Sequence, residues 1–171
     1  MKRISVFCLL FCMLFILSCQ KQPPRALTMV EKVLETHVQL PAGNMTYHAG
    51  ALPGQRAYMT SRLRTLLYDG GMDRNIPEFE GVLDYAVNLS DGQYGMEIHV
   101  FCMKSEADAR NMEKLLQRRV KLLKRRSLYL YAPSVYENYF ASATVITEGK
   151  VVFLLATGMN DEIAKQLKDM L

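Results

Sequence analysis

The sequence predicts an α+β fold, namely a four-stranded, mostly antiparallel sheet with helices on one face, preceded by one or two N-terminal helices. Two observations predict it. The second half of the chain contains two pairs of strand-like segments, and each pair is joined by a short turn. A helix-like segment follows each pair, so the order is strand, strand, helix, strand, strand, helix. At 171 residues the chain has room for one domain.

The strands are predicted from apolar side chains that recur at every second residue. On the second strand this pattern puts Ile98, Val100 and Cys102 on one face. The last strand is apolar throughout over residues 151–155, which predicts a central position in the sheet. The predicted strands are residues 82–89, 96–103, 143–147 and 150–156.

The helices are predicted from apolar residues at three- and four-residue spacing. Thr28 is a suitable cap for the first helix because Glu31 follows three residues later. Residues 40–54 are rich in proline, glycine and asparagine and are predicted to be a loop. The first helix is expected to start near residue 26, and the others to cover residues 56–68, 105–126 and 160–171.

The first eighteen residues predict export. Lys2 and Arg3 precede an uncharged run that is shorter than the ~20 apolar residues of a membrane span, but it suits the core of a signal peptide. Residues 16–19, Ile-Leu-Ser-Cys, resemble the bacterial lipobox, with Ile16 in place of the commoner leucine. Cys19 is therefore predicted to carry a diacylglyceryl group after cleavage behind Ser18, and two acyl chains hold a protein stably at a membrane. An uncleaved N-terminal anchor is the alternative.

These features divide the chain into three parts. Residues 1–18 are predicted to be the signal peptide, 19–26 a lipidated linker and 27–171 a single α+β domain. Within the domain, residues 27–80 form a helical and loop lead-in, and 81–171 form the sheet core. The expected location is the extracytoplasmic face of a cell membrane, with the protein held there by its lipid.

The charge and the cysteines of the chain exclude some classes of function. The formal net charge is +4, part of which leaves with the signal peptide, and nucleic acid is not an expected partner outside the cell. Cys102 is the cysteine that remains besides Cys19, so no internal disulfide is expected, and Cys102 is predicted to be a small buried hydrophobe. No metal-ligand spacing or phosphate-binding glycine loop occurs, so no metal or cofactor is predicted.

Part of the chain resembles a known family over residues 85–156. The matching segments are Met96–Phe101, Glu106–Ala109, Tyr131–Pro133, Ala143–Val145 and Gly149–Leu154. This stretch is similar to the bacterial lipoproteins described as domain of unknown function 4358, which occur mainly in low-GC Gram-positive bacteria. The family usually has a more acidic helix, whereas the corresponding helix here is basic. The resemblance implies a lipid-anchored α+β domain and implies no reaction.

Two clusters are candidate binding surfaces. Cations on the helix after residue 105 form either a solvated face or a surface that adheres to an anionic envelope component or protein partner. The tyrosines that follow either fill the edge of the core or serve in recognition. The candidate binding residues are Arg118, Arg119, Lys121, Lys124, Arg125, Arg126, Tyr129, Tyr131, Tyr136 and Tyr139.

Catalytic residues are not predicted, because no recognised catalytic motif occurs. Glu97 and His99 share one strand face and could form an acid–base or metal pair, but an ordinary polar face is the favoured explanation. His99 is expected to face solvent or a polar partner. The leading hypothesis is a non-enzymatic binding or envelope-associated module. The alternatives are an envelope hydrolase and a structural subunit of an envelope complex.

Overall fold

The structure is a computed structural model of the chain, and it describes residues 25–41, 45–69, 79–90, 95–130 and 133–171, with the backbone alone at 126–130. The predicted signal peptide and Cys19 lie outside the described residues. No helix within the described ranges is both long and apolar enough to cross a membrane. The elements are α2 Ala26–Thr36, β1 Met45–His48, α3 Ser61–Tyr68, β2 Val82–Leu89, β3 Glu97–Met103, α4 Glu106–Leu130, α5 Pro133–Val135, the π-helical turn η1 Tyr136–Phe140, β4 Thr144–Glu148, β5 Val151–Ala156 and α6 Asn160–Asp169.

The sheet has five strands in the order β1-β2-β3-β5-β4, and each neighbouring pair is antiparallel. The α+β class and the antiparallel sheet are confirmed, but the expected number of strands is wrong. The additional strand is β1, which lies within the predicted loop at residues 40–54. It pairs with the edge of β2, where the Asn88 side-chain amide donates to Thr46 Oγ1 at 2.8 Å.

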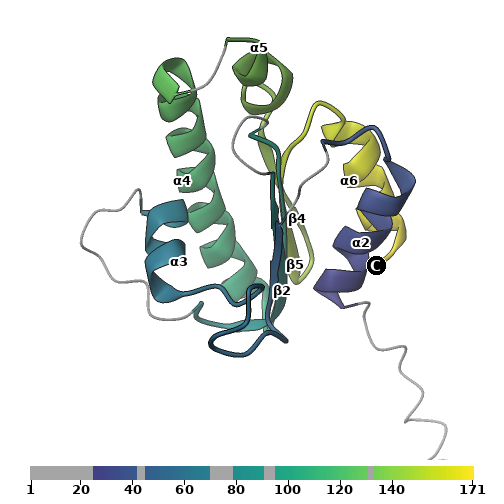
Figure 1. Ribbon diagram of the computed structural model, residues 1–171. Coiled ribbons are helices and arrows are strands. Elements are labelled where there is room, and N and C mark those ends of the chain that lie inside the picture. The colour runs from purple at the N-terminus through teal and green to yellow at the C-terminus, as the bar shows by residue number, and fades with distance from the viewer. Residues whose placement is uncertain (1–24, 42–44, 70–78, 91–94, 131–132) are drawn as a thin grey trace, which may run out of the picture.

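Helices cover both faces of the sheet, so the prediction that they lie on one face is wrong. Figure 1 shows α3 and α4 on one side of the sheet and α2 and α6 on the other. The residues of β5 explain why two helix layers are needed. Val152 and Leu154 are buried against the α3/α4 layer, whereas Phe153 and Leu155 are buried against α2 and α6. A strand that is apolar on both faces is stable only where both faces are covered.

α4 connects β3 to β4, which run parallel to each other because β5 lies antiparallel between them. The helix therefore crosses one face of the sheet and packs on it through Ala109, Met112 and Leu116. Because α4 extends over 25 residues, its rise is about 37 Å, and its last turns lie far from the turn at which it begins. This length determines where the cationic side chains of α4 are placed.

α2 begins where expected but with a different partner for its first amide, and α3 begins later than expected. The first backbone amide of α2, that of Ala26, donates to Asp84 Oδ2 at 2.9 Å, so a residue of β2 takes the role expected of Thr28. α3 begins at Ser61 rather than at residue 56, because Thr60 Oγ1 accepts from the Leu63 amide at 3.2 Å and caps the helix there.

The start of β2 contains a bulge. The register with β3 shifts between Val82 and Asp84, which leaves Leu83 outside the regular alternation with 64% of its surface exposed. The segment after β1 lies at this same end of the sheet, since the Ala49 amide donates to the Tyr85 carbonyl at 3.1 Å.

Candidate functional site

A chain of four polar side chains is buried between the sheet and the α3/α4 layer. The Arg119 guanidinium on α4 forms a two-point ion pair with Glu97 on β3, with Nε 3.0 Å from Oε2 and Nη2 closer still to Oε1. His99 Nε2 lies 3.1 Å from the same Oε2, and His99 Nδ1 lies 2.9 Å from the Tyr68 hydroxyl at the end of α3. Arg119 Nη1 also donates to the Leu67 carbonyl at 3.2 Å. These bonds connect α3, α4 and β3.

The protonation states follow from burial and charge. Burial raises the pKa of the Glu97 carboxyl, but the Arg119 guanidinium and the hydrogen bond from His99 outweigh it and lower that pKa to about 2. Burial lowers the pKa of His99, so this imidazole is neutral at neutral pH. A carboxylate only accepts, so His99 Nε2 carries the proton, and Nδ1 accepts from the Tyr68 hydroxyl. Burial, followed by the charge of Glu97, raises the pKa of Tyr68 well above its usual range.

This arrangement corrects the expectation for Arg119 and decides between the two options for His99. Arg119, expected among the exposed cations of the helix, is 8% exposed and binds Glu97. His99, expected to face solvent or a polar partner, is fully buried and has polar partners on both ring nitrogens. Glu97 and His99 do share one strand face and do interact, as their alternation predicts. Their burial keeps them from direct contact with a substrate in solution.

A pocket of about 590 Å³ opens beside this network, between the end of α3 and the second half of α4. Three of the residues that line it, Arg118, Lys121 and Arg125, lie three or four positions apart and therefore on one helical face. The described residues that line it are Tyr68, Asp69, Arg118, Lys121, Leu122, Lys124 and Arg125. Four of the predicted binding cations thus meet at one pocket.

The lining combines positive charge with apolar surface. Arg118, Lys121, Lys124 and Arg125 are all exposed, whereas the Tyr68 ring is buried and closes the inner side. The aliphatic stems of lysine and arginine add apolar area while their charged ends stay in water. Asp69 also borders the pocket, with Oδ2 buried and without a hydrogen-bond partner among the described residues. The cations and the apolar lining together suit an anion that also presents apolar surface.

The predicted tyrosine cluster is divided by the structure. Tyr136 and Tyr139 are half-buried on η1 and pack against the core, and Tyr139 also lines a separate pocket of about 490 Å³ with Glu137, Asn138 and others. The side chains of Arg126 and Tyr129, and the whole of Tyr131, lie outside the described residues. The structure does not bring Tyr136 or Tyr139 to the cationic pocket.

Cys102 is half-buried on β3 and packs against the α2/α6 core, close to its expected role as a small hydrophobe. Burial, with the charge of Asp84, raises the pKa of its thiol to about 11, so it stays protonated and unreactive at neutral pH. No group of three or more histidine, cysteine, aspartate or glutamate residues within the described ranges is placed to hold a metal ion.

Three lining residues, Tyr68, Asp69 and Leu122, are not identified by the sequence patterns. Tyr68 and Asp69 stand at a predicted helix end, where nothing local indicates that α4 passes beside them. Leu122, an apolar residue between Lys121 and Lys124, is the one signal that the cations border an apolar surface.

Comparisons with protein-family models, with curated proteins and with solved structures gave no match to the chain.

Proposed function

We propose that the protein is a lipid-anchored, extracytoplasmic binding module without enzymatic activity, and that it holds an anionic ligand of the cell envelope in the cationic pocket. The observation that carries the proposal is the meeting of Arg118, Lys121, Lys124 and Arg125 around one pocket of about 590 Å³. Their aliphatic stems can line the apolar part of the pocket while their charged ends stay available to an anion.

The first nineteen residues support the lipid anchor. A positive start, an uncharged core and a lipobox-like ending at Cys19 predict export, cleavage and attachment of a diacylglyceryl group. The resemblance to domain of unknown function 4358 implies the same kind of anchored α+β domain. We therefore place the domain on the extracytoplasmic face of a cell membrane.

A binding role is favoured over the envelope hydrolase by the state of Glu97 and His99. Both side chains are buried and bonded to Arg119 and Tyr68, and the pKa of Glu97 near 2 keeps that carboxylate from acting as a base or an acid. A structural subunit of an envelope complex remains the other alternative. It predicts a protein partner rather than a small or polymeric anion.

The first test measures binding of fluorescein-labelled polyphosphate to the full chain by fluorescence anisotropy at low and high salt. We expect binding that salt weakens, and we expect the double variant Lys121→Glu/Arg125→Glu to lose affinity by about tenfold, equivalent to about 1.4 kcal/mol. The matched control is Lys32→Glu/Lys150→Glu, which changes the net charge equally at exposed positions that do not line the pocket. Equal losses in both variants would contradict a defined pocket.

The second test is mass spectrometry of the full-length gene product extracted from membranes after crosslinking in intact cells. We expect a mature N-terminus at Cys19 that carries the diacylglyceryl mass. An N-terminus at Met1 without added mass would refute the anchor. A reproducible crosslinked protein on an acylated chain that does not bind the polyanion would favour the structural subunit.

A further inference from the structure

Two exposed leucines lie at the end of the domain where α2 begins. Leu52 is 65% exposed and Leu83 is 64% exposed. The bulge at the start of β2 turns Leu83 out of the sheet, and Leu52 lies in the segment between β1 and α3. Large apolar side chains this exposed are normal when scattered, so their meaning here depends on what else lies at the same end of the domain.

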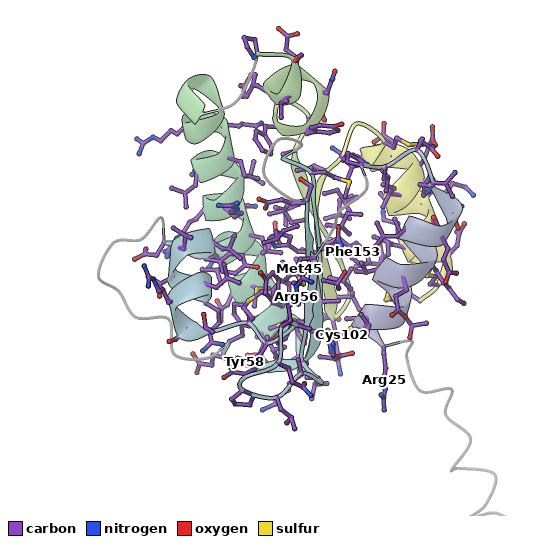
Figure 2. The ribbon with its side chains drawn as sticks, in the orientation of Figure 1. Arg25, Met45, Arg56, Tyr58, Cys102 and Phe153 are labelled. Carbon is purple, nitrogen blue, oxygen red and sulfur yellow. The ribbon has the colours of Figure 1, made fainter. Side chains whose placement is uncertain are left out.

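Hydrogen bonds show that these segments share one end of the sheet. The Ala26 amide binds Asp84, the residue after Leu83, at 2.9 Å. The Ala49 amide binds the carbonyl of Tyr85 at 3.1 Å, which holds the segment that carries Leu52 beside the same strand. Figure 2 shows Arg25 and Tyr58 toward this same lower end.

The exposed charges at this end are of both signs. Arg25 and Lys104 are exposed, and Lys104 belongs here because its amide donates to the Gly81 carbonyl at 2.9 Å. Glu80 and Glu106 are exposed acidic residues beside Lys104, and Glu106 lies 4.0 Å from Arg110, while Asp84 is bound to the start of α2. Leucine side chains can enter the headgroup region of a bilayer, and neighbouring lysine and arginine side chains can contact anionic headgroups there.

We propose that this end is the membrane-facing surface of the domain, with Leu52 and Leu83 entering the headgroup region and Arg25 and Lys104 contacting anionic lipid. The inference rests on the proposed lipid anchor. Six residues from Cys19 to Arg25 span at most ~22 Å, so a lipid on Cys19 keeps the start of α2 near the bilayer.

The cationic pocket is then held at a distance from the anchoring membrane. It lies on the opposite side of the sheet from α2 and beside the second half of α4, whose last turns are at the end remote from Arg25 (Figures 1 and 2). The ligand of the pocket therefore comes from the extracytoplasmic space, and the headgroups of the anchoring bilayer are not that ligand.

The test places a spin label at Leu52→Cys or Leu83→Cys in the full, lipidated chain, with Cys102→Ser to remove the remaining thiol. The protein is reconstituted into vesicles of phosphatidylglycerol and phosphatidylethanolamine. We expect the accessibility of both labels to a water-soluble relaxation agent to fall several-fold on reconstitution. Val38→Cys is the matched control, because Val38 is 84% exposed just beyond the other end of α2 and its label is expected to stay in water.

Two results separate this inference from the proposed function. Acylated protein whose labels at positions 52 and 83 stay as accessible as the label at position 38 would overturn the membrane-facing surface and leave the anchor intact. Protein that mass spectrometry shows to lack the acyl groups would overturn the anchor, and with it the basis of the orientation.

Discussion

Arg119 holds a buried carboxylate in its charged state. The two oxygens of Glu97 accept from Arg119 Nε and Nη2 and from His99 Nε2, so three N–H donors compensate for the loss of water. Removing one partner of such a pair leaves an isolated buried charge, which is far more costly than the pair itself is stabilising. The stability of the domain should therefore depend on pH.

We predict that the free energy of unfolding falls as the pH is lowered from about 6.5 toward 2. His99, with its pKa lowered by burial, gains a proton on unfolding once the pH drops below its unfolded value of ~6.5. Glu97 follows between its unfolded pKa of ~4.3 and its folded pKa of about 2, a contribution of about 3 kcal/mol. Urea unfolding at a series of pH values measures this decline.

The Arg119→Met variant provides the control for this prediction. At pH 7 it should lose about 3–5 kcal/mol, because Glu97 stays buried without its cation. Below pH 4 the difference from the wild type should shrink, because Glu97 becomes protonated in the variant at a higher pH than in the wild type. A difference that is the same at pH 3 and pH 7 would show that Arg119 acts through packing alone.

Among individual residues, the sequence predicts two of the four members of the buried network, Glu97 and His99. The two-residue period puts Glu97 and His99 on one strand face, and the structure confirms that they interact. The same helix carries exposed Arg118 and buried Arg119, and these neighbours differ by about 100° around the helix axis. Which of the two side chains faces the sheet depends on how α4 packs on it, and local spacing does not specify that.

The elements were predicted best where both ends carry a turn or a cap. β2 has the expected bounds, and β3, β4, β5 and α6 differ by one or two residues. β1 was missed because its four residues are too few for the alternation of Met45 and Tyr47 to indicate a strand, and they lie among proline, glycine and asparagine. Its strand structure comes from pairing with β2, which is a tertiary contact.

Gly95, just before β3, is a turn position where a side chain does not fit. Its φ is +62°, and an added Cβ would stand 2.6 Å from the ring of Phe140 in η1. We predict that Gly95→Ala lowers the free energy of unfolding by about 2–5 kcal/mol, through left-handed strain and a clash in a packed core. Urea unfolding measures the loss.

Gly149 is the matched control for this prediction. Its φ of +56° is nearly the same, but an added Cβ meets nothing within 4 Å. Gly149→Ala should therefore show the backbone strain alone, about 1–2 kcal/mol. In a Phe140→Leu background the cost of Gly95→Ala should be smaller, because the smaller side chain leaves room for the added methyl group. Equal losses of unfolding free energy in the two single variants would show that backbone strain alone accounts for the loss.

For the whole molecule, the sequence gives the class of the fold but not its layering. Periodicity identifies α2 as a helix with one apolar face, and that face is buried as expected through Met29, Val30 and Val33. It does not say which face of the sheet the helix will cover, because that depends on contacts with residues more than fifty positions away. The second layer was consequently missed, and with it the fact that the start of α2 and the cationic pocket lie on opposite faces.

The placement of α2 also has a mechanical consequence. A tether attached before Arg25 transmits any pull to the first turn of α2, which contributes no strand to the sheet and is held there by side-chain packing and by the bond from Ala26 to Asp84. The five strands behind it are joined by backbone hydrogen-bond ladders. Under load, α2 should therefore peel away before any strand separates. The face of β2 and β3 that carries Ala86, Ile98 and Val100 would be uncovered while the α3/α4 layer remained in place.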